Sequence, residues 1–404
     1  MSTHTILTQK PGGLSRRQFC RKLAWAGGAL AIGHSIPALG GEPESPSPIP
    51  AHLTRYAELY RQDPRQASLH WFRDARFGMM PCYYLASLDG RHCFEQWQFK
   101  IPVGEYEKKM RQFTAEKFDA NFIADLAVAA GMKYITFVTK HCEGFCLWDT
   151  KLTDFNSVQS AARRDLVGEM VKACNQRGLG FFAFYEHGFD WHHPDGPRHK
   201  DFNIPLAEIP YPTPEPRYAY GKDYDLNKYL DYASDQVAEL LTNYGPIAGI
   251  WLDGVGVPVS AKDPGIFHAQ KLYDRIHVLQ PHALVSYKFG LTGTEDFKAP
   301  EAFQLVHIKP GQESKPVELC EALNKSWSYI RGEAHRDADW AWKRMGFVRA
   351  NDMNYLLGVG PLPDGSVYPD DVKTLQEIGR RLRAQGWPKG SGKQEGPVDI
   401  PAAG

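Results

Sequence analysis

The sequence predicts an α/β protein whose main part is a (β/α)8 TIM-like barrel in one domain. Runs that are apolar on both faces alternate with amphipathic helical patterns from about residue 51 to residue 386. Strands of this kind, separated by helices, indicate a parallel sheet covered by helices. The number of units favours a barrel over a doubly wound sheet, and no GxGxxG or P-loop motif follows any of the strands.

The expected strands are short apolar runs that end in polar residues. In chain order these runs span residues 76–85, 133–141, 179–187, 247–254, 283–290 and 351–361. The expected helices between or after them carry apolar residues at helical spacing and span residues 114–132, 164–178, 230–245, 271–281 and 370–386. Thr114 is placed to cap the first of these helices, and Gly178 to end the second.

The N-terminal segment has the pattern of an export signal rather than of a folded element. Arg16 and Arg17 precede a moderately apolar stretch and then small residues, as in twin-arginine signal peptides, although a chance arginine pair before a buried helix gives the same letters. We therefore expect a signal peptide at 1–40, a Pro/Ser linker at 41–50, the catalytic barrel at 51–386 and a flexible tail at 387–404. The mature protein would be periplasmic or secreted.

Charge and hydropathy exclude two classes of partner. Lys plus Arg and Asp plus Glu both number 47, so the formal net charge is zero and gives no electrostatic basis for binding nucleic acid or an anionic membrane. Beyond the expected signal, no segment is long and apolar enough to span a bilayer. The sequence does not indicate an oligomeric state.

Polar residues at the expected strand ends are the candidate site, because barrels carry their chemistry at the C-terminal ends of the strands. These residues are Cys82 to Tyr84, His141 to Glu143, Tyr185 to His187, Asp253 and Lys288. Asp253 suits a nucleophile or a metal ligand, although it could instead cap the next helix. Hydrolysis of a glycoside with retention needs a second carboxyl about 5–5.5 Å from the first. The acids that could supply it are Glu295, Asp296, Glu301, Glu318 and Glu333.

Several long blocks resemble a known family. They include "WFRDARFGMM", "MKYITFVTKHCEGFCLWDTKLTDFNSVQS", "YGPIAGIWLDG", "ELCEALNKSWSY" and "MNYLLGVGPLPDGSVYPDDVKTLQEIG". In their order and spacing these blocks are similar to the α-L-fucosidases of glycoside hydrolase family 29. The resemblance runs from about Trp71 to Gly386 and is weaker between about Lys200 and Asp223.

The resemblance implies a (β/α)8 barrel and a retaining double displacement on an oligosaccharide or glycoconjugate. It assigns the nucleophile to Asp253, in "WLDG", and the acid/base to Glu318, in "VELC", with Glu301 as the reserve. It further implies a glycone pocket lined by His141, Tyr185, His187, Trp191 and Tyr83. Many members also carry a C-terminal β-sandwich, which we do not expect in this chain.

Three positions that the resemblance assigns to gripping fucose hydroxyls hold cysteine instead. Cys82 stands in the usual "HWG" or "HYG" block, Cys142 replaces the second His of "KHHEGF", and Cys93 takes the Glu position of an "EW" pair. The thiols could line a changed pocket, two could pair in a disulfide, or all three could bind zinc. Fourth-ligand candidates for zinc are His141, Glu143, Glu95 and Glu186. Cys146, Cys174 and Cys320 are interpreted as core residues.

The predicted function is that of an exo-acting retaining glycoside hydrolase of the α-L-fucosidase type, with the identity of the glycone left open. One alternative is a zinc- and cysteine-dependent glycosidase that acts on another sugar, such as a furanoside. The other is a non-catalytic carbohydrate-binding descendant. Retention of both Asp253 and Glu318 argues against a binding protein, which has no need of the pair.

Overall fold

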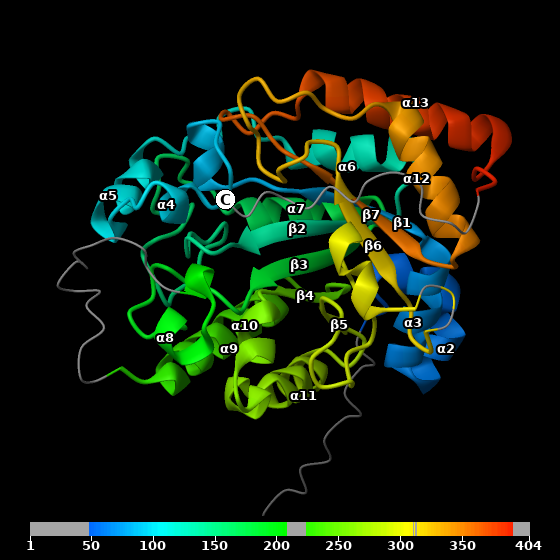
Figure 1. Cartoon of the computed structure of the whole chain (residues 1–404). Coiled ribbons are helices and arrows are strands. Elements are labelled where there is room, and N and C mark those ends of the chain that lie inside the picture. The colour runs from blue at the N-terminus through cyan, green and yellow to red at the C-terminus, as the bar shows by residue number, and fades with distance from the viewer. Residues whose placement is uncertain (1–47, 208–223, 310, 312, 391–404) are drawn as a thin grey trace, which may run out of the picture. The chain divides into compact units, whose positions relative to one another are not determined.

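Seven parallel strands form the centre of the structure, a computed structural model that describes residues 48–207, 224–309, 311 and 313–390. Their bounds are β1 Phe77–Pro81, β2 Tyr134–Lys140, β3 Gly180–Glu186, β4 Gly249–Asp253, β5 Leu284–Tyr287, β6 Glu318–Ala322 and β7 Asn354–Val359. The order across the sheet is β5-β4-β3-β2-β1-β7-β6, and every pairing is parallel. Because the sheet curls, the strands surround a common interior, as Figure 1 shows.

An irregular segment takes the eighth position between β5 and β6. Phe297 bridges in parallel to Ser286 of β5, whereas Glu301 bridges in parallel to Cys320 of β6. The backbone N–H of Ala299 also donates to the carbonyl of Lys288, and that of Glu318 donates to Lys298. The predicted eight-stranded barrel is therefore built from seven regular strands and this segment, whose Pro300 cannot donate to a ladder.

Strand side chains alternate between the barrel interior and the helix layer. On β3, Phe182 and Phe184 lie in the interior cluster with Trp251, whereas Phe181 and Ala183 belong to the cluster under the helices. This period of two continues to the strand ends, and it decides which of two neighbouring residues faces the candidate site.

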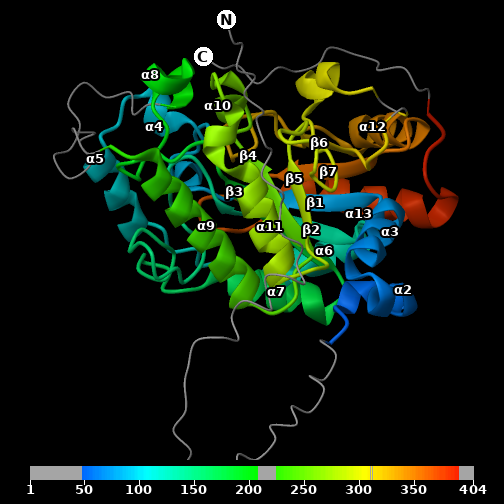
Figure 2. The ribbon, with the colours of Figure 1, turned by 90° about the horizontal axis from the view of Figure 1, so that it is seen from below.

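Helices cover the outside of the barrel and both of its ends (Figure 2). The outer helices are α6 Ala120–Ala129, α7 Leu166–Gln176, α9 Leu226–Thr242, α11 Ala269–Leu279, α12 Ala338–Ala350 and α13 Pro369–Gln385. At the N-terminal ends of the strands lie a 3-10 helix at Ala51–Tyr56, α2 Ala57–Gln62 and α3 Pro64–Ala75. Trp71 and Phe72 of α3 pack on Phe182, which closes this end of the interior.

Short helices surround the opposite end, where the strands finish. They are α4 Glu95–Gln98, α5 Val103–Glu107, α8 His199–Phe202 and α10 Gly256–Ser260, with further 3-10 turns at Leu85–Leu88, Lys108–Arg111, Pro205–Ala207, Pro264–Phe267 and Ala302–His307.

No helix in the described part of the chain is long and apolar enough to cross a membrane.

Two predicted helix ends can be compared directly with the structure. The helix expected from Thr114 begins instead at Ala120, because the Asp119 carboxylate accepts from the backbone N–H groups of Asn121 and Phe122 at 2.9 and 3.1 Å. Gly178 does follow the end of α7, with a φ of 65° that favours glycine. The expected signal peptide and most of the expected linker and tail lie outside the described residues and stay predictions.

Candidate active site

A cavity of about 330 Å³ opens at the C-terminal ends of the strands. Its wall is rich in aromatic rings, from Tyr84, Phe94, Phe184, Phe189, Trp251, Phe303 and Trp327. Its polar side chains are those of His92, Cys93, His141, Glu186, Asp253, Lys288, Glu301, Gln304 and Cys320. A mostly apolar cavity with a few convergent polar groups is typical of a small-ligand site.

A second, larger hollow of about 1110 Å³ lies between α12 and residues 385–390. It is lined by Arg76 and Met353, which precede β1 and β7, so it belongs to the N-terminal end of the strands. Asp352 is the one acidic side chain among its described lining residues. A hydrolysis that needs two carboxyls cannot be placed there, and barrel chemistry is expected at the other end.

Asp253 and Glu301 meet at the Lys288 ammonium on the wall of the smaller cavity. Lys288 Nζ lies 3.3 Å from Asp253 Oδ1 and 2.7 Å from Glu301 Oε1. Since both oxygens contact one atom, they are at most about 6 Å apart, close to the about 5–5.5 Å carboxyl spacing of retaining glycosidases. Asp253 ends β4, and Glu301 ends the segment in the eighth position.

Lys288 is held in an unusual backbone conformation to reach both acids. Its φ is 48°, in the left-handed region that side chains other than glycine rarely adopt, and such strain is frequent at functional sites. Burial by itself lowers the pKa of Lys288, but Asp253 and then Glu301 outweigh burial and raise the pKa above its ordinary value. The ammonium therefore stays charged between the two carboxylates.

Glu186 is a third acid on the cavity wall. It ends β3, where it pairs with Asp253 across the ladder, and it is 2% exposed. Burial, and then the charge of Asp253, raise the pKa of Glu186 well above its ordinary value. The close approach of β3 and β4 requires Gly254, because a Cβ there would lie 2.1 Å from Glu186 Oε1 and the φ is 79°.

Glu318 does not line the cavity, although the sequence favoured it as acid/base. It is the first residue of β6 and lies two residues before Cys320, which does line the cavity. Both point inward, but Glu318 is about 7 Å nearer the N-terminal end of the strand. Its oxygens accept hydrogen bonds from Tyr134 Oη at 2.6 Å and Trp251 Nε1 at 2.9 Å. The structure thus brings Glu301, not Glu318, to Asp253.

The buried Glu318 carboxyl makes a testable contribution to the pH dependence of stability. Burial outweighs its two hydrogen bonds and raises its pKa from 4.5 to about 7. The folded state therefore holds a proton that the unfolded state has lost, so this contribution is complete below about pH 4.5 and vanishes as the pH rises through about 7. We expect Glu318→Gln to remove about 3 kcal/mol of this pH dependence. Urea unfolding of the wild type and of Glu318→Gln at pH 5 and pH 8 gives the change in the free energy of unfolding between the two pH values. An equal change in both proteins would contradict the prediction.

Of the five predicted sugar-contacting residues, the structure brings His141 to the cavity. Tyr83 and Tyr185 belong to the cluster under the helices, where Tyr83 Oη donates to the carbonyl of Pro363 and Tyr185 Oη donates to Gln236. Their neighbours Tyr84 and Glu186 face the cavity, as the alternation of strand side chains requires.

His187 and Trp191 also lie outside the cavity lining. His187 is buried against Tyr287, with Nδ1 3.2 Å from Tyr287 Oη. Trp191 packs behind Cys142 and donates its Nε1–H to the carbonyl of Leu206 at 2.8 Å. Both residues therefore support the loop after β3.

The three cysteines singled out in the sequence do not form one metal-ligand group among the described residues. Cys82 is fully buried, with its thiol towards the carbonyl of Met80, and does not line the cavity. Cys93 does, with Sγ 3.7 Å from His92 Nδ1. All six described cysteines are free, which leaves no disulfide among them. Cys146 and Cys174 are core residues, as predicted.

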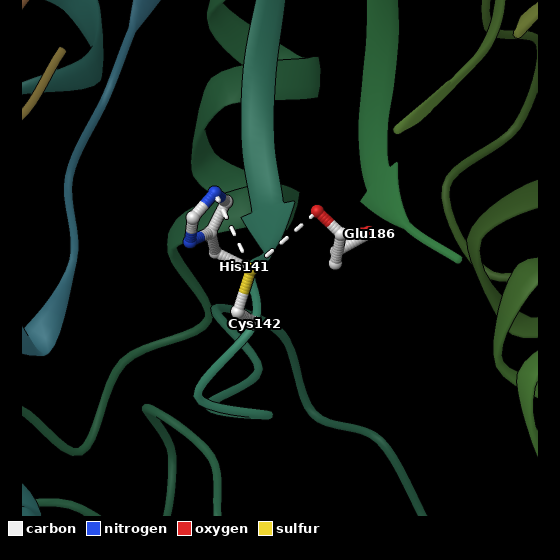
Figure 3. A group of neighbouring side chains, drawn as sticks. All are labelled: His141, Cys142 and Glu186. Carbon is white, nitrogen blue, oxygen red and sulfur yellow. Dashed lines mark hydrogen bonds between the residues drawn. The ribbon is translucent and has the colours of Figure 1, made fainter. Parts of the chain in front are cut away.

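Cys142 instead lies with His141 and Glu186, two of the residues considered as a fourth ligand. The donor atoms of these three side chains all lie within 4.8 Å of one another, and no other such group occurs within the described ranges (Figure 3). Of the other two candidates, Glu95 pairs with Lys109, and Glu143 lies behind His141 rather than in the group. The structure thus replaces the three-thiolate set with a mixed set of nitrogen, sulfur and oxygen.

The α-L-fucosidase family model matches residues 49–387, which is most of the chain and all of the barrel. The chain belongs to the α-L-fucosidase family. The resemblance noted in the sequence is therefore confirmed. Family membership makes it a glycoside hydrolase.

Known relatives agree with this assignment. The chain is 33% identical to the plasma α-L-fucosidase of Rattus norvegicus, over 84% of this chain and 76% of the relative. A relative from Caenorhabditis elegans is 25% identical, and the match covers 77% of this chain but 64% of that protein. The chain thus spans less than two thirds of the length of some fucosidases that it matches.

Solved fucosidase structures share the fold. Isoenzyme 1 of Paenibacillus thiaminolyticus superposes with a TM-score of 0.69 at 32% identity, covering 80% of this chain and 77% of that chain. The AlfC enzyme of Lactobacillus casei, solved with α-L-fucose, gives a TM-score of 0.68 at 27% identity and covers 78% of this chain and 98% of its own. These superpositions confirm the (β/α)8-like fold predicted from the sequence.

Proposed function

We propose that this chain is an exo-acting, retaining α-L-fucosidase-type hydrolase that releases a terminal sugar from an oligosaccharide or glycoconjugate. The observation that supports this most is the placement of Asp253 and Glu301 on the wall of one cavity, both against Lys288. Family membership gives the reaction class, and the spacing of the two oxygens suits retention.

In the proposed first step, Asp253 attacks the anomeric carbon as the bond to the leaving oxygen breaks. Glu301 gives its proton to that oxygen, which leaves as an alcohol, and a glycosyl ester forms on Asp253. In the second step, Glu301 takes a proton from water, the water oxygen attacks the anomeric carbon, and the ester breaks. Two inversions at one carbon restore the original configuration.

Lys288 links the two proposed catalytic acids, because its ammonium contacts both side chains. It is therefore placed to orient Asp253 and Glu301 relative to each other and to a sugar bound at the cavity wall.

The size and lining of the cavity favour one terminal sugar. A volume of about 330 Å³ is at the lower end of ligand pockets, which span about 300–1,000 Å³. Trp251 forms part of the wall, and the Lys288 ammonium lies 4.6 Å from the centre of its ring. Aromatic faces stack on the C–H faces of sugars, so an aromatic wall suits a deoxy sugar with a methyl group such as fucose.

A panel of 4-nitrophenyl glycosides tests the proposal. We expect the α-L-fucoside to be the fastest substrate, and proton NMR at early times to show α-L-fucose before mutarotation. A different preferred glycone would revise the sugar while leaving the reaction class intact. First formation of β-L-fucose, or no turnover of any member of the panel, would contradict the proposed mechanism.

The two alternatives from the sequence have no support in the comparisons. The matched proteins are named as fucosidases, and none of those compared above is named as a furanosidase or a binding protein. A non-catalytic descendant would also have no need of the Asp253–Lys288–Glu301 arrangement.

A further inference from the structure

Three donor atoms of different chemistry converge at the ends of β2 and β3. Cys142 Sγ lies 3.6 Å from Glu186 Oε2 and 3.9 Å from His141 Nε2. In a tetrahedral zinc site with a Zn–S bond of about 2.3 Å and Zn–N or Zn–O bonds of about 2.0–2.2 Å, sulfur lies roughly 3.5–3.7 Å from each lighter donor. Both sulfur distances are within a few tenths of an ångström of these values, and all three donor atoms lie within 4.8 Å of one another.

We propose that His141, Cys142 and Glu186 form a binding site for one zinc ion, with its fourth coordination position open to the cavity. Figure 3 shows a ring nitrogen of His141 and a carboxylate oxygen of Glu186 converging on the Cys142 sulfur. His141 and Glu186 both line the cavity, so an ion between them is reached from it. Three protein ligands and one open position is the usual arrangement of a catalytic or ligand-binding zinc.

The histidine is oriented as a metal ligand by a second carboxylate. His141 presents Nε2 to Cys142, while its other nitrogen, Nδ1, faces Glu143 Oε2 at 3.6 Å. Both of these facing atoms are buried and have no hydrogen-bond partner among the described residues. A carboxylate behind the free nitrogen of a metal-bound histidine fixes its tautomer and is a recurrent feature of zinc sites. Tyr84 and Phe94 pack on the ring of His141 and limit its rotation.

The carboxylate is likewise held in place with one oxygen left for an ion. Glu186 Oε1 accepts from the backbone N–H groups of Gly188 at 3.1 Å and Phe189 at 3.2 Å. The other oxygen, Oε2, accepts a hydrogen bond from the Cys142 thiol at 3.6 Å, and a shared ion would take the place of that proton. Among the described residues Glu186 forms no salt bridge, whereas Lys140 pairs with Asp190 and Lys288 with Asp253 and Glu301. A zinc ion would give this buried acid a cation in direct contact.

The loop after β3 fixes the cysteine. Asp190 pairs with Lys140 at 2.8 Å, which ties this loop to the end of β2. The next residue, Trp191, donates its backbone N–H to the carbonyl of Cys142 at 2.7 Å. The position of Sγ is therefore set by buried contacts rather than by a free loop.

The donor set selects the kind of ion. A thiolate and an imidazole favour zinc and similar borderline metals over calcium or magnesium, which prefer oxygen donors. On binding, the Cys142 thiol loses its proton to solvent as the Zn–S bond forms. The open position would hold water or a hydroxyl of the bound sugar. That last role rests on the proposed function, whereas the metal site itself does not.

Elemental analysis of the purified full chain after equilibration with zinc and desalting tests the site. We expect about one equivalent of zinc in the wild type and little in Cys142→Ser or Glu186→Gln. Cys82→Ser and Cys93→Ser are the matched controls, since neither thiol belongs to the group, and both should retain the metal. With cobalt in place of zinc, thiolate-to-metal absorption should appear in the controls and the wild type and be absent in Cys142→Ser.

Two further measurements keep the test valid if a variant folds poorly. Zinc should raise the melting temperature of the wild type and the controls but not of Cys142→Ser. Glu143→Gln should keep the site but bind zinc about 10–100-fold more weakly. A wild type without bound metal, or equal loss of zinc in Cys93→Ser and Cys142→Ser, would overturn the proposal. These readouts do not use turnover, so they stand apart from any failure of the proposed fucosidase activity.

Discussion

Asp253→Ala is expected to give a folded protein whose turnover falls on the order of 10⁴–10⁶-fold, the loss typical of removing a nucleophile or its activating partner. Asp253 ends β4 at the cavity wall, and its side chain is 20% exposed, so it contributes little to packing. Its removal leaves Lys288 paired with Glu301 at 2.7 Å, so no buried cation loses all its partners. The loss should therefore be chemical rather than structural.

Azide identifies the nucleophile in this variant. The small anion can enter the space left by the carboxylate and attack the anomeric carbon from the same face, which gives a β-L-fucosyl azide from an α-L-fucoside. Product NMR and a partial return of turnover are the expected results. Asp263→Ala is the matched control, because Asp263 follows β4 but is an exposed helix cap, and its activity should be unchanged. Near-normal turnover of Asp253→Ala without azide would refute the assignment.

Six of the seven regular strands could be predicted from the sequence because their signals are local, whereas β6 was not among the expected strands. The runs over β2, β3 and β4 are apolar on both faces and end in polar residues, which is typical of a parallel sheet. The eighth position could not be predicted in this way. Half of the residues in its segment, "DFKAPE", are charged and one is a proline, and the segment is held by isolated bridges to Ser286, Val317 and Cys320.

Which residues face the cavity follows from strand register, which the sequence does not give directly. Asp253 and His141 were found because they directly follow apolar runs. Tyr185 and His187 were assigned to the sugar and Glu186 only to a metal, although one step along a strand moves a side chain from the interior to the helix layer. Counting back in steps of two from Asp253, through the interior Trp251, and applying the same alternation to β3 gives Glu186 as the residue that faces the cavity.

The acid/base position illustrates a different limit. The resemblance favoured Glu318 because its block aligns with part of the family, yet the depth of a residue along its strand is set by the three-dimensional register of β6 against its neighbours. Glu318 pairs with Asn354, the first residue of β7, and so lies in the lower layer of the barrel. Glu301 reaches the cavity from an irregular segment that no periodic pattern reveals.

The cysteines could be recognised as departures, but their grouping could not be predicted. Residues that replace sugar-binding positions need not form one metal site, because contact with a common sugar does not require their side chains to meet at one point. The fold buries Cys82 beneath the cavity lining, leaves Cys93 beside His92, and joins Cys142 to His141 and Glu186. The proposed ligand set is therefore mixed rather than made of three sulfurs, and it still includes His141 and Cys142.

Glu301→Gln is expected to slow substrates with poor leaving groups by about 10²–10⁴-fold while leaving activated aryl fucosides much less affected. A disaccharide must receive a proton on its leaving oxygen, whereas a dinitrophenolate leaves without one. Gln keeps the size of the side chain and can still accept from Lys288, so the cavity should be preserved. The measurement is kcat/KM across a series of fucosides whose leaving groups differ in pKa.

Glu318→Gln is the matched comparison, because both acids follow from the same family resemblance and only one lines the cavity. We expect its kcat/KM to be nearly independent of the leaving group, with any loss uniform across the series. Azide separates the roles further. In Glu301→Gln it should attack the glycosyl ester on Asp253 and give the α-L-fucosyl azide, since the two displacements together retain configuration. A steep dependence on the leaving group in Glu318→Gln, with none in Glu301→Gln, would return the acid/base role to Glu318.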